Sequence, residues 1–211
     1  MRIAVLGGTG SFGRALAARL VADGAHEVVI GSRDEARAGE TAAELGGAVS
    51  GAENSDAASR ADLVVLAVKA DGALDTARAV ADALGTTPLL SVASAIEFRK
   101  GVGALPDPDS QSLAERIQAI VGAPVVAGLH SIAAASLGAA PPDEDALVCG
   151  DDPAAKELAL GLAARLVAGR ALDAGPLRCA RALEGLTAVI VNLNRRYKAH
   201  AGIRVTGVES R

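Results

Sequence analysis

The chain has 211 residues, a formal net charge of −4 at pH 7 and a hydrophobic content of 50%. This length predicts one large domain, or one domain with a small appendage, around a substantial core. The acidic balance argues against general binding to nucleic acid or to anionic membrane surfaces. Membrane spanning is not expected either, because no apolar run reaches the about 20 residues that a bilayer requires.

The N-terminus and the cysteines suggest an intracellular protein. Residues 2–6 are too short for the apolar region of a signal peptide and lead directly into glycines. Cys149 and Cys179 lack metal-ligand spacing, so we expect two small, mostly buried thiols in a reducing compartment. We therefore predict a cytoplasmic protein without a metal site.

Strand-like and helix-like segments alternate along the chain. The expected strands cover residues 2–6, 27–31, 61–68, 88–93, 124–129, 146–150 and 170–173. The expected helices cover residues 12–22, 34–45, 71–84, 110–121, 153–167 and 177–197, and residues 100–109 form a linker. The strands are continuously apolar, which is typical of a parallel sheet covered on both faces. The pattern predicts an α/β protein with a doubly wound, mostly parallel sheet of the Rossmann type.

A stretch rich in proline and acidic residues, 138–145, predicts a surface loop and a domain boundary. We expect residues 1–140 to form a dinucleotide-binding domain and residues 141–211 to form a small C-terminal α/β lobe that helps to build a cleft. The pattern leaves open whether these last strands stand apart or extend the sheet.

The first strand leads into a glycine-rich turn with the spacing G-x-G-x-x-G, followed by a helix. The first glycine of such a motif permits a tight turn, the second lets the backbone approach a pyrophosphate, and the third lets helix and strand pack closely. A diphosphate would bind at the positive end of the helix. The predicted contact residues are Gly8, Thr9, Gly10, Ser11, Phe12 and Gly13.

The end of the second strand indicates which dinucleotide binds. An acidic residue there favours NAD, whereas an arginine can neutralise the 2′-phosphate of NADP. Here the strand ends in Ser32 and Arg33, with Arg37 one turn further on, and we expect Thr9 of the glycine turn to join them in selecting NADP. We interpret Asp34 as the cap of the next helix, although Arg33 and Arg37 also fit solvated surface charges. The sequence therefore predicts NADP(H).

Polar residues also follow other strands, at the edge where open α/β sheets bind ligands. His130 is a candidate to hydrogen-bond a ligand ring or carboxamide, or to make a structural backbone contact. Lys69 is either a solvated loop residue or a contact to a carboxamide or an anionic acceptor. Ser91 and Ser94 are candidate donors to a nicotinamide.

Two clusters have both a structural and a ligand-binding interpretation. Asp151 and Asp152 suggest a metal site, but Pro153 directly after them favours helix capping. Basic residues such as Arg195 and Arg196 near the end of the last helix complement its dipole. Alternatively, they could contact an acidic ligand tail.

Six segments resemble the coenzyme F420-dependent NADP oxidoreductases, and together they span most of the chain. They are residues 1–10, 29–33, 74–78, 128–134, 148–152 and 172–177. The glycine turn is shared with many Rossmann proteins. The Gly-Ser-Arg strand end, the Cys-Gly-Asp-Asp sequence and the Asp-Ala-Gly-Pro-Leu sequence are more particular to this family.

The resemblance implies a homodimer that transfers hydride between NADPH and the deazaflavin coenzyme F420, stacked on the nicotinamide between the two lobes. The segments containing Val68, Lys69, His130 and Ile132 would line that pocket. Such a transfer depends mainly on positioning, so His130 and Lys69 are only candidate catalytic residues.

Two alternatives remain. Val68-Lys69 also resembles a turn of pyrroline-5-carboxylate reductases, which suggests NADPH-dependent reduction of an imine or another small molecule, with Lys69 as an acid or anchor. A non-catalytic NADP-binding regulatory protein is the other alternative.

Overall fold

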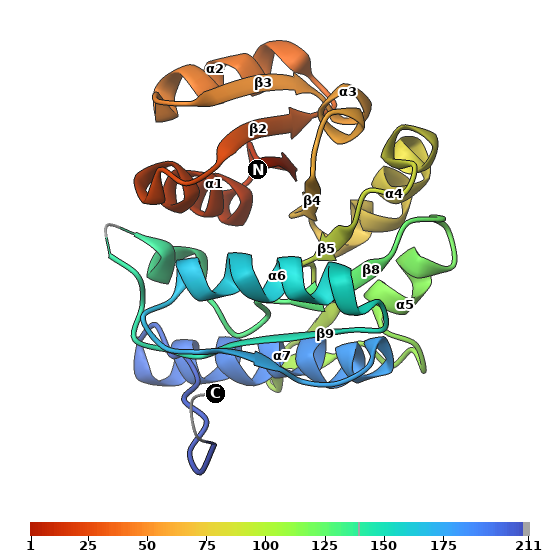
Figure 1. The fold of residues 1–211 in the computed structure, drawn as a ribbon. Coiled ribbons are helices and arrows are strands. Elements are labelled where there is room, and N and C mark those ends of the chain that lie inside the picture. The colour runs from red at the N-terminus through yellow and green to blue at the C-terminus, as the bar shows by residue number, and fades with distance from the viewer. Residues whose placement is uncertain (139, 209–211) are drawn as a thin grey trace.

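The computed structural model describes residues 1–138 and 140–208, which form an eight-stranded sheet with helices on both faces (Figure 1). The strands are β1 (Arg2–Leu6), β2 (Glu27–Ser32), β3 (Val49–Glu53), β4 (Leu63–Leu66), β5 (Leu89–Ser91), β8 (Val125–Gly128), β9 (Ala146–Gly150) and β10 (Ala171–Asp173). Their order is β10-β9-β8-β5-β4-β1-β2-β3. The run β3-β2-β1-β4-β5-β8 is parallel and has the 3-2-1-4-5-6 order of dinucleotide-binding folds. The predicted doubly wound, mostly parallel sheet is confirmed.

Helices cover the sheet as two layers, each burying its own apolar cluster. The α-helices are α1 (Ser11–Asp23), α2 (Glu35–Leu45), α3 (Asn54–Ser59), α4 (Ala70–Leu84), α5 (Leu113–Gln118), α6 (Pro153–Leu166) and α7 (Ala180–Tyr197). Short 3₁₀ segments are η1 (Ala134–Leu137) and η2 (Leu177–Cys179). One cluster joins α1, α2 and α6 to the sheet, and the other joins α3, α4, α5 and α7 to its opposite face. Both faces are buried, which explains why the central strands are continuously apolar.

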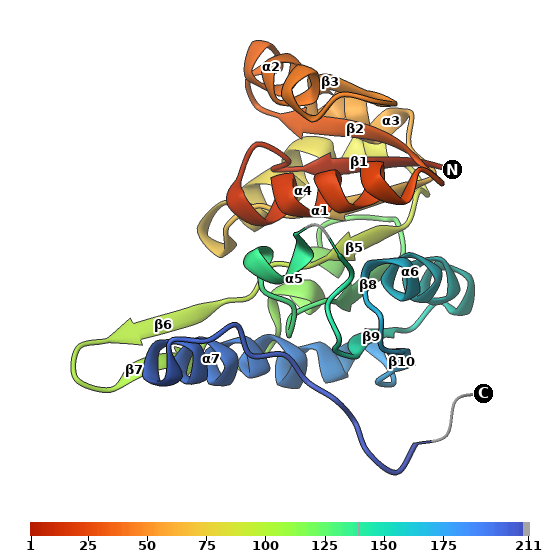
Figure 2. The same ribbon diagram turned by 90° about the vertical axis from the view of Figure 1, so that its left-hand side faces the viewer.

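The structure differs from the predicted elements at the periphery. β3 and α3 were not predicted, and residues 96–106 form a hairpin of β6 (Ile96–Arg99) and β7 (Gly103–Pro106) that overlaps only the first part of the expected linker. The helix expected at 110–121 is shorter, because Ser112 and Glu115 form a capping box that starts α5 at Leu113. Figure 2 shows the hairpin projecting from the body beside α7. Asn192 of α7 holds it through both backbone groups of Ala104, at 2.8 and 2.7 Å.

The capping interpretation is confirmed for Asp34 and Asp152 but not for Asp151. Asp34 accepts a hydrogen bond from Arg37 N at 3.2 Å, and Asp152 accepts one from Ala155 N at 2.8 Å. Asp151 instead accepts from the N–H of Leu177 at 2.9 Å. Within residues 1–138 and 140–208, no group of three or more His, Cys, Asp or Glu side chains is arranged to hold a metal ion.

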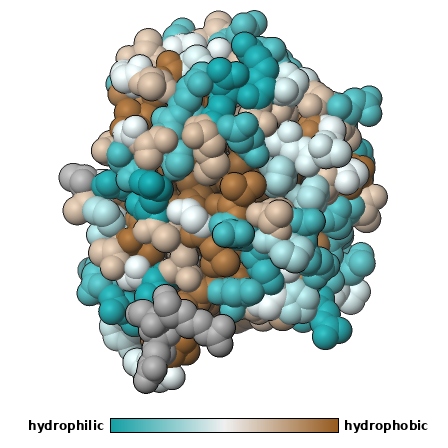
Figure 3. Space-filling view, viewed as in Figure 1, coloured by the Kyte–Doolittle hydropathy of each residue, from teal (hydrophilic) through white to brown (hydrophobic). Residues whose placement is uncertain are grey.

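The C-terminal region continues the same sheet. β9 pairs with β8 in the antiparallel direction, and β10 pairs with β9 in the parallel direction. Helices in the described part of the chain are too short or too polar to cross a membrane, and Figure 3 shows hydrophobic and hydrophilic residues interspersed on one face of the molecule. The domain boundary at residues 140 and 141 stays a prediction.

Candidate dinucleotide and acceptor site

The carboxyl ends of five parallel strands meet in one row. Leu6 of β1 pairs with Gly31 of β2 and with Leu66 of β4. Leu66 pairs in turn with Ser91 of β5, and Ser91 pairs with Ala127 of β8. The strand order reverses between β1 and β4, which is the position where ligands of open α/β sheets bind. The turns that carry the predicted site residues therefore lie along one edge.

The glycine turn between β1 and α1 leaves no room for side chains where helix and strand meet. A Cβ atom at Gly13 would clash with the carbonyl oxygen of Gly7 and would lie 2.9 Å from Gly8 Cα. At Gly10, by contrast, a Cβ would approach only the oxygen of Gly7, at 3.2 Å. The close packing expected of the third glycine is present, and the side of the turn at Gly10 is open.

The N-terminus of α1 has the unpaired donors that an anion requires. Its N-cap, Gly10, offers no side-chain cap. In the described part of the chain, the backbone N–H groups of Ser11, Phe12 and Gly13 donate no hydrogen bond, whereas Arg14 N donates to Gly10 O at 2.8 Å. Free N–H groups at the positive end of a 13-residue helix form a binding place for a diphosphate.

Two cationic side chains lie just after β2, since Arg33 follows the strand directly and Arg37 is in the first turn of α2. Ser32 is 9% exposed, and its hydroxyl accepts a hydrogen bond from Asp34 N at 3.2 Å. Arg33 and Arg37 are exposed, and neither guanidinium takes part in an ion pair or side-chain hydrogen bond with the described residues. Both remain free to bind an external anion.

The turn after β4 lies against the glycine turn. A Cβ at Gly7 would lie 2.7 Å from Val68 Cγ1, so this valine packs directly on the turn. Lys69 is the exposed N-cap residue of α4, and its backbone oxygen accepts from Gly72 N at 3.0 Å. Its ammonium group has no ion pair with any described residue.

The ends of β5 and β8 carry buried polar atoms without partners. Ser91 is fully buried, and His130 is 6% exposed, next to the left-handed backbone of Leu129 (φ 66°). The hydroxyl groups of Ser91 and Ser131 and both ring nitrogens of His130 form no hydrogen bond with the described residues. Since an unsatisfied buried polar group costs about 1–3 kcal/mol, these atoms suit a ligand that carries donors and acceptors.

His130 is neutral near pH 7. Burial lowers the pKa of its imidazole to about 4, and the backbone of Ala93 counteracts this effect only in part. A neutral imidazole donates from one nitrogen and accepts at the other. His130 can therefore orient a ligand by hydrogen bonding, but it carries no positive charge.

Sequence reasoning missed two polar residues at this edge. Thr187 of α7 donates to the backbone oxygen of His130 at 2.9 Å. A threonine hydroxyl has one hydrogen, so Ser94 Oγ, at 2.7 Å, is the donor to Thr187. The second missed residue is Asn54, which follows β3, is 4% exposed and has an unpartnered amide oxygen among the described residues. Neither residue belongs to a motif.

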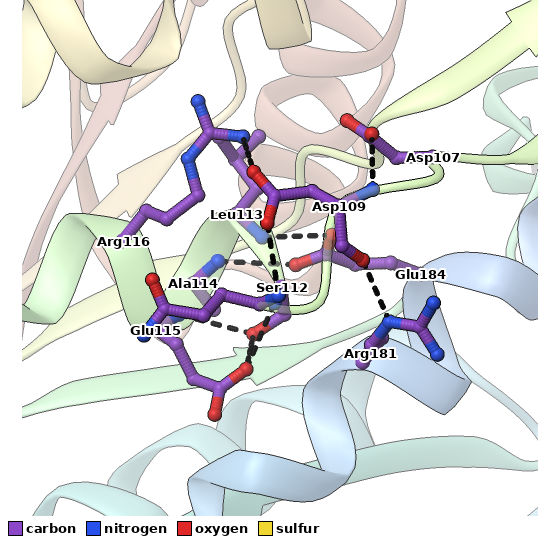
Figure 4. Close-up of polar contacts among 10 residues, drawn as sticks. Asp107, Asp109, Ser112, Leu113, Ala114, Glu115, Arg116, Arg181 and Glu184 are labelled. Carbon is purple, nitrogen blue, oxygen red and sulfur yellow. Dashed lines mark hydrogen bonds and ion pairs between the residues drawn. The ribbon is translucent and has the colours of Figure 1, made fainter.

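A cavity of about 330 Å³ lies between α5, α7 and the hairpin, next to Ala95. Glu184 is buried beside it and accepts from Leu113 N at 3.0 Å and Ala114 N at 3.1 Å (Figure 4). Burial raises the pKa of Glu184, and these backbone N–H groups oppose the rise. Glu184 therefore ties the start of α5 to α7.

The strand order and the glycine turn define a dinucleotide-binding protein of the Rossmann class. The sequence profile of the family "NADP oxidoreductase coenzyme F420-dependent" matches residues 2–95. Over 99% of the chain, the sequence is 37% identical to the F420-dependent NADP reductase of Methanothermobacter thermautotrophicus, 96% of which is covered. The chain belongs to the F420-dependent NADP oxidoreductase family.

Solved structures also resemble the chain over most of its length. A crystal structure from Arthrobacter sp. FB24, described as a candidate F420-dependent NADP reductase, superposes with a TM-score of 0.84 at 31% identity, covering 98% of this chain and 99% of that one. The NADP-bound pyrroline carboxylate reductase of Plasmodium falciparum has a TM-score of 0.62 at 13% identity, covering 94% of this chain and 64% of that one. The second likeness extends to the fold alone.

Proposed function

We propose that this protein transfers hydride between NADPH and coenzyme F420. The observation that carries the proposal is the arrangement of one sheet edge. Free N–H groups of α1 lie on one side of the switch point, and the unpartnered atoms of Ser91 and His130 lie on the other. A ligand that spans this edge would use both sets of groups. Family membership supplies the identity of the two redox partners.

The residues divide into three groups along the edge. The diphosphate of NADPH would bind Gly8, Thr9, Gly10, Ser11, Phe12 and Gly13. Its 2′-phosphate would bind Ser32, Arg33 and Arg37. The nicotinamide and the deazaflavin would lie against Val68, Lys69, Ser91, His130 and Ile132. We also propose that residues 141–211 complete the acceptor cleft, since α7 supplies Thr187, which contacts the backbone of His130.

The chain acts mainly by positioning. When bound, the two coenzymes supply the hydride donor and the acceptor carbon, and no protein nucleophile or metal ion is needed. His130 would orient a ring through hydrogen bonds of its neutral imidazole. Thr187 and Ser94 fix the backbone at His130, and the buried Ile132, 5% exposed, supplies an apolar wall that excludes water. The exposed, unpaired Lys69 gives the imine-reductase alternative no specific support.

Mixing the protein with NADPH and oxidised F420 should bleach the deazaflavin absorbance. Thr187→Val should slow this transfer roughly five- to tenfold, because the backbone of His130 loses a hydrogen bond worth about 1 kcal/mol. NADPH affinity should fall less than the transfer rate, since the diphosphate and the 2′-phosphate would bind residues to which Thr187 makes no hydrogen bond. Absence of bleaching despite tight NADPH binding would refute the proposed reaction. It would favour an imine reductase or a regulatory protein instead.

We further propose a cytoplasmic homodimer that pairs through α7 and the hairpin. Among residues 1–138 and 140–208, five of the eight exposed large hydrophobic residues lie there, and the free cysteines favour a reducing compartment. The five are Phe98, Val102, Val189, Leu193 and Tyr197. In sedimentation experiments, Val189→Asp should yield monomers, whereas Leu158→Asp on α6 should leave the dimer intact. A monomeric wild-type protein would exclude the dimer.

A further inference from the structure

Residues 199–208, here called the C-terminal strap, run back across the start of β9. Asp145 donates its backbone N–H to Ile203 O at 2.6 Å, and Val205 N donates to Asp145 Oδ2 at 2.8 Å. Arg170 pairs with Asp145 at 2.6 Å and also donates to the backbone oxygen of Val205. The strap is therefore held by part-buried hydrogen bonds to Asp145 and Arg170 at one point of the sheet.

Glu144 lies directly beneath this strap. Its side chain is 4% exposed, and neither carboxyl oxygen forms a hydrogen bond with the residues that the structure describes. Gly202 lies so close that a Cβ there would clash with the Glu144 carboxyl group. Burial raises the pKa of Glu144 to about 7, and the backbone of Ile203 counteracts this rise only in part.

The neighbouring charged groups do not neutralise Glu144. Asp145 is paired with Arg170, which holds the pKa of this aspartate well below its usual range. Asp143 is exposed and paired with Arg204. His200 and Arg204 line the same small cavity of about 170 Å³, yet no ion pair joins either of them to Glu144. An ionised Glu144 would thus be a buried charge with no cationic partner among the described residues, which is unfavourable.

We propose that Glu144 is a pH-sensitive latch for the C-terminal strap. The strap stays closed over the protonated carboxyl group and opens more often once that group has lost its proton.

The direction of the pH effect follows from linkage. An exposed glutamate in the open state has its ordinary pKa of 4.5, whereas closure raises the pKa to about 7. The open state therefore binds fewer protons than the closed state in this interval, so opening becomes more favourable as the pH rises. Above the higher value both states are ionised, and the effect levels off.

The cavity beside Glu144 is connected to the candidate site through η1. Ser136 lines the cavity beside Glu144 and belongs to η1, which packs against α1. η1 follows the segment that contains His130 and Ile132. Opening of the strap would loosen the wall that joins the acceptor side of the site to the helix of the glycine turn.

Hydrogen exchange of the full-length protein, corrected for the intrinsic pH dependence, tests the latch. Peptides covering 199–208 contain the N–H groups of Ala201 and Val205, which are hydrogen-bonded when the strap is closed. Their opening constant should rise by up to roughly tenfold per pH unit between about pH 5 and 7, then level off. Glu144→Gln should abolish the rise, whereas the control Asp143→Asn should retain it.

Three results would overturn the proposal. They are a wild-type opening constant that does not change with pH, a Glu144→Gln protein that keeps the rise, and loss of the rise in His200→Asn, which would assign it to the histidine. If Glu144→Gln does not fold, the pH profiles of the wild-type protein and of His200→Asn still test the proposal. A rise of the opening constant that persists in His200→Asn supports its assignment to Glu144.

Discussion

Gly13→Ala should lower the affinity for NADPH by roughly 100-fold. The added methyl group would clash with the oxygen of Gly7 and would lie 2.9 Å from Gly8 Cα, and both are backbone atoms that cannot swing aside. The glycine turn must therefore move relative to α1. Donors to a charged phosphate are worth about 1.5–3 kcal/mol each, so misplacing the N–H groups of this turn is enough for a loss of that size. Fluorescence titration with NADPH measures it.

Gly39→Ala is the matched control. Gly39 lies within α2, and a Cβ there would meet nothing within 4 Å. The substitution should leave NADPH affinity unchanged and should raise the free energy of unfolding by about 0.5–1 kcal/mol, since alanine is the better helix former. Wild-type NADPH affinity in Gly13→Ala would show that the turn does not depend on this close packing.

The central sheet could be predicted because its signals are local. β1 and β4 are short apolar runs whose side chains are almost all buried, and the glycine turn follows β1 directly. The helix caps at Asp34 and Asp152 could be predicted for the same reason, because capping depends on residues close to one another in the chain.

β3 could not be predicted because its residues do not look like those of a buried strand. It is an edge strand with mostly half-exposed residues, and it contains Gly51, where a Cβ would clash with the backbone of α2 at Ala38. The direction of β9 has no sequence signal either. Because β9 is antiparallel to β8, it places Gly150 opposite Val126, so Asp151 and Asp152 lie at the edge away from His130.

Contacts between distant segments were the other feature that sequence could not show. Thr187 is 57 positions from His130, and Ser94 is 93 positions from Thr187. A threonine in an amphipathic helix gives no sign of its partner. Likewise, the burial of Glu144 depends on the strap that crosses it, and nothing near Glu144 in the sequence predicts that crossing.

Arg33→Ala should weaken NADPH binding by about 10- to 100-fold and should change NADH binding little. The guanidinium of Arg33 is exposed and has no partner among residues 1–138 and 140–208, so its removal breaks no interaction within the protein. A charge-assisted hydrogen bond to a phosphate is worth about 1.5–3 kcal/mol, and only NADPH carries the 2′-phosphate.

The control for Arg33→Ala is Arg78→Ala, which removes an exposed arginine of α4 that is paired with Asp75. It should alter neither affinity, because α4 carries no residue proposed to contact the 2′-phosphate and an exposed ion pair contributes little to the stability of the fold. Titration of each variant with both dinucleotides separates the cases. Equal losses for NADPH and NADH in Arg33→Ala would mean that this arginine does not recognise the 2′-phosphate, leaving Arg37 and Ser32 as the remaining groups at the end of β2 to do so.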